Sequence, residues 1–266
     1  FKNILFTVPS VYESRHMILS LSISDFKYQF LGSYMGMIWA ILRPLIFISV
    51  IGFIFTIGFK RSMLNSEVPF VVHLLTGYVP WLFFSDSVSS CMNSFVQNRI
   101  LINTPKFKIG FLPLIRLITS FYSHLIFFLL LILVLTYYGY YPDIYWIQLL
   151  FYLFCLSLLI YSFGVLIASL RVFSKDVAEV VGIILQIGFW VTPIFWSLSL
   201  IPQEYHSVIS YNPMVYIIEG YRDSLVNKIW FWEVSGFLNY LITTSFFLIF
   251  GKLIFTRLKP HFSDVI

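Results

Sequence analysis

Long apolar stretches without a charged residue follow one another along the chain. Runs of 18 to 27 residues without Asp, Glu, Lys or Arg cover 68–85, 117–142, 144–170, 180–203 and 234–251. A helix needs about 20 mostly apolar residues to cross the hydrocarbon core of a bilayer. The fold class we expect is therefore an all-α integral membrane protein, with residues 1–266 forming one transmembrane domain. Read with their flanks, the runs predict six spans, at about 37–58, 70–95, 112–138, 145–170, 178–198 and 235–256.

The distribution of basic residues indicates how these spans are oriented. With the first residues placed in the cytoplasm, eleven Lys and Arg residues fall in cytoplasmic segments and four in external ones. Cytoplasmic loops of membrane proteins carry an excess of Lys and Arg. We therefore expect an even number of spans, with both termini in the cytoplasm.

The segment 1–34, before the first span, has the pattern of a helix at a membrane surface. Leu19, Ile23, Phe26 and Phe30 recur at helical spacing, with polar residues on a neighbouring face. Such an amphipathic helix lies in the plane of the interface with its apolar side toward the acyl chains. We expect a cytoplasmic interface helix here.

Two connecting segments are more than simple turns. The cytoplasmic loop 97–110 is basic and is broken by Pro105. The external segment 199–233 is too short for a domain and too apolar for a solvated loop. Within it, Asn212 followed by Pro213 is typical of a helix start. The Asn side chain can accept a hydrogen bond from a free backbone N–H of the first turn, and proline has no backbone N–H that would need a partner. We expect short helices that dip into the outer membrane face.

The composition supports the membrane class and excludes several others. Hydrophobic residues make up 59% of the chain and charged residues 11%, against roughly 45–50% apolar residues in soluble domains. The aromatic share of 20% is more than interfacial belts require. Two cysteines cannot form a disulfide framework, and the net charge of +5 is explained by basic cytoplasmic loops without invoking nucleic acid.

No motif for catalysis or nucleotide binding is present. The chain lacks the GxxxxGK[ST] pattern that cradles phosphates, so if ATP powers the protein, another chain binds it. The five histidines are not at metal-ligand spacing, and neither a GxSxG nor a DxD pattern occurs. We expect no cofactor or metal in this chain, and the missing motifs argue against an enzyme.

Asp86 is the clearest ionisable residue inside a predicted span. A charge at the bilayer centre costs at least about 2.5–3.5 kcal/mol, so such residues are functional candidates. Asp86 lies among serines, which suggests that this half of the helix faces protein or water. A proton relay and a hydrogen-bonded packing role both remain open.

Five motifs in order resemble the permease subunits of type-2 ABC exporters of polysaccharides, most closely those for lipopolysaccharide O-antigen. The resemblance covers essentially the whole chain. The motifs are GSYMGMIWAILRPL at 32–45, LINTPKFKIGFLPL at 101–114, RVFSKDVAEV at 171–180, YNPMVYIIEGYRDSL at 211–225 and LKPHFSDVI at 258–266.

The resemblance implies a homodimer bound to two copies of a separate ATP-binding subunit, which holds the ATP and magnesium. The interface helix and the loop 97–110 would dock on that subunit, the loop acting as a coupling helix. Relatives commonly have a Pro–Arg pair there, whereas this chain has Lys106 and Lys108 around Phe107. The coupling candidates are Arg99, Pro105, Lys106, Phe107 and Lys108, and the gate candidates in the external segment are Asn212, Pro213, Glu219 and Arg222.

The implied cargo is a polysaccharide linked to undecaprenyl pyrophosphate, moved across the bacterial inner membrane. Aromatic rings offer flat apolar faces to the C–H faces of sugars without gripping them. Arg43 and Arg116 are candidates for attracting the pyrophosphate or anchoring lipid headgroups. A permease for teichoic acid, capsule, drugs or small lipids, a membrane enzyme and a stand-alone channel are the alternatives. The candidate channel-lining residues are Tyr78, Trp81, Phe84, Trp190 and Phe195.

Overall fold

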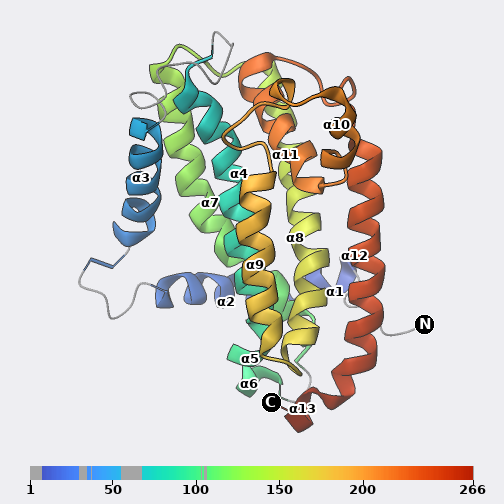
Figure 1. Ribbon diagram of the computed structural model, residues 1–266. Coiled ribbons are helices and arrows are strands. Elements are labelled where there is room, and N and C mark those ends of the chain that lie inside the picture. Colours follow the sequence, from blue (N-terminus) through green and yellow to red (C-terminus); the bar gives the residue numbers. More distant parts are fainter. Residues whose placement is uncertain are drawn as a thin grey trace.

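The computed structural model describes residues 8–29, 35–36, 38–54, 68–102, 104 and 107–265. Across these residues the regular secondary structure is helical and contains no strand, which confirms the all-α fold class. The long helices stand side by side in an upright bundle (Figure 1). They are α3 (Ile38–Phe53), α4 (Phe70–Met92), α7 (Phe111–Tyr137), α8 (Leu149–Arg171), α9 (Asp176–Val191) and α12 (Phe237–Leu258).

Shorter helices lie at the two ends of the bundle. We call the lower end in Figure 1 the α5–α6 end and the upper end the α10–α11 end. The lower set comprises α5 (Ser94–Gln97), α6 (Arg99–Ile102), η5 (Lys259–His261) and α13 (Phe262–Val265), and the upper set η2 (Ile144–Gln148), η3 (Leu198–Leu200), α10 (Gln203–Ile209), α11 (Pro213–Arg222) and η4 (Asp223–Asn227).

Within the described residues, three helices are long and apolar enough to cross a membrane, judged by length and composition. They are Phe111–Tyr137, Ile144–Arg171 and Phe237–His261, and they agree within a few residues with the third, fourth and sixth predicted spans. The first, second and fifth predicted spans contain α3, α4 and α9. The six-span topology therefore remains a prediction.

The helix in the fifth predicted span is shorter than its apolar run. That span was placed at 178–198, but α9 ends at Val191 and Thr192 adopts an extended conformation, with φ −79° and ψ 139°. The cause is Pro193, because a proline disfavours helical geometry in the residue before it. The apolar residues after Thr192 belong instead to a bent segment at the α10–α11 end.

Glycines bring the central helices close together. A Cβ atom added at Gly164 of α8 would lie 2.8 Å from the Cβ of Cys91 in α4. One added at Gly251 of α12 would lie 3.0 Å from the carbonyl oxygen of Ser162 in α8. In a bilayer the hydrophobic effect does not drive helices together. Helix packing depends instead on van der Waals contact, which small residues increase because they let two backbones approach closely. α8 therefore packs tightly against both α4 and α12.

The helix α2 (Arg15–Tyr28) crosses the lower part of the bundle instead of running along it (Figure 1). Ile18 and Ser22 are buried where α2 meets α7. The Ser22 hydroxyl donates to the carbonyl of Ile115 at 3.3 Å, and the Thr119 hydroxyl donates to the carbonyl of Ser22, also at 3.3 Å. Polar contacts as well as packing thus attach α2 to the bundle.

The predicted apolar face of the interface helix differs from the face that packs. Leu19 and Ile23 are 45% and 44% exposed, whereas Phe26 contacts the ring of Tyr122 in α7 at 5.6 Å between centroids. Phe30 lies outside the described residues. The helix itself is confirmed, and its exposed Leu19 and Ile23 are free to contact lipid.

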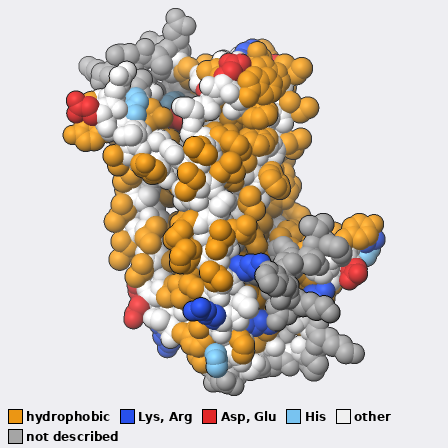
Figure 2. All heavy atoms as spheres, turned by 90° about the vertical axis from the view of Figure 1, so that its right-hand side faces the viewer, with side chains coloured by type: hydrophobic (Ala, Val, Ile, Leu, Met, Phe, Trp, Pro, Cys, Tyr) orange, Lys and Arg blue, Asp and Glu red, His pale blue; other side chains and the backbone are white. Residues whose placement is uncertain are grey.

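Apolar and basic side chains are unevenly distributed on the face formed by α12. Figure 2 shows hydrophobic side chains along the height of this face, with most Lys and Arg toward its lower end. The second half of α12 and the turn after it carry Lys252, Arg257 and Lys259. The α5–α6 end is thus a basic end of an otherwise apolar bundle.

Candidate functional site

The helix α11 begins as the sequence predicts. The side-chain oxygen of Asn212 accepts a hydrogen bond from the backbone amide of Met214 at 3.0 Å, and Pro213 is the first helical residue. The segment 199–233 contains η3, α10, α11 and η4, so short helices do form in the predicted external segment.

The body of α11 is buried between other helices. It packs against α4, α8 and α12, and its residues from Met214 to Ile218 are all buried. At Gly220 the ring of Tyr152 from α8 occupies the space that a Cβ atom would need. Only glycine fits at this contact between α11 and α8.

Replacing Gly220 with alanine is expected to destabilise the protein. The added methyl group would overlap the buried Tyr152 ring, and overpacking of this kind costs about 1–3 kcal/mol. The measurement is thermal unfolding of the purified protein together with its amount in membranes. Gly182→Ala is the matched control, because a Cβ there meets nothing within 4 Å. Equal stability of the two variants would contradict the prediction.

Three side chains from distant elements hold the segment Thr192–Trp196, which we call the 192–196 strip. Arg222 donates to the carbonyl of Ile194 at 3.0 Å. The Nε2 atom of His73 in α4 lies 3.3 Å from the carbonyl oxygen of Trp196, and the amide of Asn212 donates to the Thr192 hydroxyl at 2.9 Å. Because the strip has left the helix, its backbone needs such partners. The strip therefore links α9, α4 and α11.

Arg222 is the central residue of this network. It is 4% exposed and donates to the Glu219 carboxylate at 2.7 Å and to the carbonyl of His73 at 3.3 Å. Burial lowers the pKa of Arg222, whereas the Glu219 carboxylate acts in the opposite direction. Arginine stays charged in proteins. A fixed positive charge is thus buried beside the end of α9.

Asp223 adds a second carboxylate next to Arg222. Burial raises the pKa of Asp223 to about 6, and a hydrogen bond from the Asn227 amide, at 2.8 Å, lowers it. Asp223 begins η4, a single wide helical turn. The end of α11 therefore concentrates charge in a partly buried position at the α10–α11 end.

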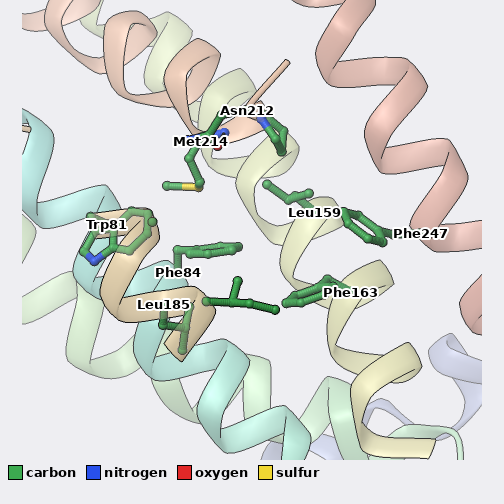
Figure 3. Close-up of a pocket in the computed structure, with 11 residues that line it drawn as sticks. Trp81, Phe84, Leu159, Phe163, Leu185, Asn212, Met214 and Phe247 are labelled. Carbon is green, nitrogen blue, oxygen red and sulfur yellow. Dashed lines mark hydrogen bonds between the residues drawn. The ribbon is translucent and has the colours of Figure 1, made fainter. Parts of the chain in front are cut away.

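A pocket of about 230 Å³ lies below the start of α11 (Figure 3). In Figure 3, Trp81, Phe84 and Leu185 form one side, Leu159, Phe163 and Phe247 form the other, and Asn212 and Met214 close one end. The remaining lining residues are Ile184, Gly188 and Pro213.

The structure separates the predicted channel-lining residues into three sets. Trp81 and Phe84 line the pocket together with the predicted gate residues Asn212 and Pro213. Tyr78 and Phe195 are buried and contact Phe189 of α9, with ring centroids 6.2 and 5.0 Å away. Trp190 stacks on Phe195 at 5.3 Å but is 60% exposed on the outside of α9.

One face of α4 is polar and partly exposed. Ser85, Asp86, Ser89 and Asn93 share this face by helical spacing, and none of them is buried. Asp86 is the exposed one of the four and forms no ion pair within the described part of the chain. We call this the α4 polar face. The described part of a single copy leaves this face partly exposed.

Of the predicted coupling residues, Arg99, Phe107 and Lys108 are described, and they lie at the α5–α6 end. Arg99 begins α6, and the Lys108 ammonium lies 5.7 Å from the centre of the Phe111 ring where α7 begins. Phe107 is partly buried against the core. Pro105 and Lys106 lie outside the described residues.

Ile100, next to Arg99, was missed by the sequence analysis. It is 85% exposed at the tip of the bundle. Its neighbour Ile102 is buried, so α6 has one face toward the protein and one away from it. An isolated isoleucine in a basic loop has no periodic signal, and only its exposure in the structure identifies it.

An aromatic cluster supports the α5–α6 end. The ring of Phe262 in α13 lies 5.1 Å from Phe95 in α5, 6.0 Å from Phe255 in α12 and 6.1 Å from Phe173 after α8. Phe95 and Phe262 are fully buried. The end of the chain therefore braces the base of the segment that carries Ile100.

Of the two arginines predicted to bind pyrophosphate or headgroups, the structure describes the side chain of Arg116. Arg116 in α7 forms an ion pair with Asp25 of α2 at 3.3 Å, and this pair joins the two helices. The side chain of Arg43 lies outside what the structure describes. Both assignments remain predictions.

Within the described residues, the bundle combines apolar helices long enough to cross a membrane with a short-helix end and a basic end, as in an integral membrane protein. The ABC-2 type transporter family matches residues 18–226, and the chain belongs to this family. The resemblance drawn from the five motifs is confirmed.

Relatives of this chain match it over nearly their whole length. It is 26% identical over 252 residues to the O-antigen export system permease protein RfbA of Klebsiella pneumoniae, covering 94% of this chain and 95% of the relative. It is 26% identical over 219 residues to the protein of the same name from Myxococcus xanthus, covering 81% and 82%. It is 25% identical over 247 residues to the polysialic acid transport protein KpsM of Escherichia coli, covering 91% and 93%.

Proposed function

We propose that two copies of this chain form the transmembrane part of an ATP-driven exporter of lipid-linked polysaccharide, O-antigen on undecaprenyl pyrophosphate, across the bacterial inner membrane. The observation that carries the proposal is the match, along almost the whole chain, to relatives named as O-antigen export permeases. The polar face of α4, the basic α5–α6 end and the short helices at the opposite end support the proposal.

The proposed topology has six spans, with both termini and the α5–α6 end in the cytoplasm. The basic residues of α12 and of the loop 97–110 lie at that end, as the positive-inside rule requires. α2 then lies along the cytoplasmic surface with Leu19 and Ile23 toward the lipid. The α10–α11 end faces outward.

The cargo path is proposed to run between the two copies along the α4 polar face. A polar strip in an apolar bundle costs free energy if it faces lipid, and this cost is avoided where it borders a water-filled path. Asp86 and Ser89 would meet the hydrated glycan there. Trp190, exposed on α9, would offer a flat apolar surface to sugar C–H groups.

ATP and magnesium would be held by a separate subunit docked at the α5–α6 end. Ile100 offers an exposed apolar anchor there, and Arg99 and Lys108 offer charge. The segment 199–233 would act as the external gate. The 192–196 strip and Arg222 connect that gate to α9, so a movement of α9 would reach α11 directly.

A capsular polysaccharide is the second candidate cargo. It is favoured by the similarity to KpsM, whose name describes polysialic acid transport. The two cargoes differ in their surface products, since one appears in lipopolysaccharide and the other in capsule. If the chain were a permease for teichoic acid, drugs or small lipids, its loss would change the amount of neither surface product.

The proposed function is tested by deleting the gene in its native host. Lipid-linked O-antigen is expected to accumulate inside the cell while surface O-antigen disappears, and the wild-type gene is expected to restore export. Loss of capsule alone would assign the second cargo. Normal amounts of both surface polymers would refute polysaccharide export, and association with no ATP-binding subunit would refute an ABC exporter.

A further inference from the structure

The pocket in Figure 3 lies on the flank of the bundle and is walled by two helices that both pack on α8. α9 provides Ile184, Leu185 and Gly188, and α12 provides Phe247. α8 forms the floor with Leu159 and Phe163. The pocket is thus a recess between α9 and α12, with Trp81 and Phe84 of α4 also in its lining.

The lining of this pocket offers almost nothing to a polar ligand. Asn212 is the one lining residue with a polar side chain group besides the Trp81 indole. Both ends of its amide are in use, since the nitrogen donates to Thr192 and the oxygen accepts from Met214. In Figure 3 the Trp81 nitrogen is turned away from the opposite wall. A sugar hydroxyl placed here would lose its hydrogen bonds to water without replacement.

The pocket is continuous with the apolar outer surface of the bundle. Ile184 lines it and is 49% exposed, and its neighbours Ile183 and Ile187 on α9 are 56% and 57% exposed. On α12, Phe246 and Phe250 flank Phe247 and are 49% and 45% exposed. In a membrane this surface is covered by acyl chains, so the pocket opens where hydrocarbon is the solvent.

The volume of the pocket and the lack of charged residues in its walls indicate which kind of molecule fits it. A cavity of about 150 Å³ lined by apolar side chains holds a benzene molecule, and this pocket is larger, at about 230 Å³. The walls run through 180–203 and 234–251, which contain no charged residue. Nothing in them would hold the pyrophosphate of a lipid carrier. A neutral hydrocarbon chain from an abundant bilayer lipid fits these conditions.

We propose that this pocket binds an acyl chain of a membrane phospholipid, which fills the space between α9 and α12 beneath α11. The site is distinct from the proposed cargo path, because the pocket is formed by one copy of the chain and its lining contains none of the four residues of the α4 polar face. The chain packs against Trp81 and Phe84 on one side and Phe163 and Phe247 on the other. It thereby supports the side of α9 that the other helices leave open.

Trp81 allows a direct test, because it is only 5% exposed. Phospholipids brominated in the middle of the acyl chain quench tryptophan only by contact. Lipids around the bundle reach exposed tryptophans such as Trp190, but they reach Trp81 only by entering the pocket. The wild-type protein and Trp81→Phe are purified in detergent and titrated with brominated phospholipid. We expect a quenched component in the wild type that is missing from Trp81→Phe.

Filling the pocket supplies the matched comparison. Leu185→Phe narrows the pocket, whereas Ile187→Phe adds the same bulk on the exposed side of α9. The quenching of Trp81 is expected to be lost in Leu185→Phe and kept in Ile187→Phe. Native mass spectrometry of the wild type is expected to show a retained phospholipid, a readout that does not depend on how any variant folds.

Two results would overturn the proposal. One is identical quenching in the wild type and Trp81→Phe together with no retained phospholipid. The other is displacement of brominated phospholipid by polyprenyl phosphate at about a tenfold lower concentration than by ordinary phospholipid, which would assign the pocket to the lipid carrier. Neither result bears on whether gene deletion blocks polysaccharide export, so the two proposals fail separately.

Discussion

Replacing Arg222 with methionine is expected to abolish export and to lower the stability of the protein. The change leaves Glu219 without its partner and removes the Arg222 donor from the carbonyl groups of Ile194 and His73, of which the His73 carbonyl still accepts from the Thr76 hydroxyl. Removing one partner of a buried ion pair costs about 3–5 kcal/mol, and the 22% exposure of Glu219 places the loss at the lower end. The 192–196 strip would lose its link to the end of α11 and keep the Asn212–Thr192 hydrogen bond at the start of that helix, so movement of α9 would be transmitted less directly to the α10–α11 end.

The measurements are thermal unfolding of the purified variant and surface polysaccharide in a complemented deletion strain. Lys228→Met is the matched control, because Lys228 is also basic and lies at the same α10–α11 end, but its side chain is 58% exposed and pairs with Asp143. Arg222→Lys is expected to recover part of the stability, because one ammonium group cannot replace the planar fork of arginine. Wild-type stability and export in Arg222→Met would rule out the proposed role of this residue.

Replacing Ile100 with aspartate is expected to prevent the ATP-binding subunit from copurifying with this chain. Ile100 is 85% exposed, so the change disturbs no packing within the chain. Burying an isoleucine at an interface contributes about 1.5–3 kcal/mol, and a buried unpaired carboxylate adds a further penalty. The complex should therefore weaken by at least about tenfold, since 1.4 kcal/mol corresponds to that factor.

Tyr137→Asp is the matched control for this experiment, because Tyr137 is 84% exposed at the opposite end of α7. It is expected to leave copurification unchanged. Equal recovery of the subunit with Ile100→Asp and with the wild type would place the docking surface elsewhere. Failure of the wild type to recover any ATP-binding subunit would instead contradict the proposed exporter.

The sequence was a good guide to the helices and a weaker one to their ends. The helix α7 differs from the predicted span 112–138 by a single residue at each end. The end of α9 was missed although Pro193 is visible in the sequence, because the apolar run continues past it and hydropathy does not register the break. What makes the break tolerable is Arg222, which lies far along the chain and donates to the freed carbonyl of Ile194.

The candidate site was predicted in part. Trp81, Phe84, Asn212 and Pro213 were named separately, and the structure places them around one pocket. Aromatic content could not show that Tyr78 would be buried, because residues a few positions apart on one helix face different neighbours.

For α2 as well, the sequence pattern did not predict which face of the helix packs against the bundle. Its periodicity indicated a helix, but the surface that packs on α7 carries Ile18 and Ser22, and Leu19 and Ile23 stay exposed. A hydrophobic side chain has two apolar environments in a membrane protein, the interior of the bundle and the lipid. Pattern alone does not distinguish between them.

The sequence by itself determined that this protein is a bundle of membrane helices with a basic end, and it identified the family. The physical reason is local, since a backbone in lipid must satisfy its hydrogen bonds within each helix, and long apolar runs mark where that happens. Only the tertiary structure decided which polar groups meet. His73 and Arg222 stand 149 residues apart, and their contact depends on how α4 and α11 are rotated and packed. That rotation brings together the buried arginine, the broken end of α9 and the pocket below them.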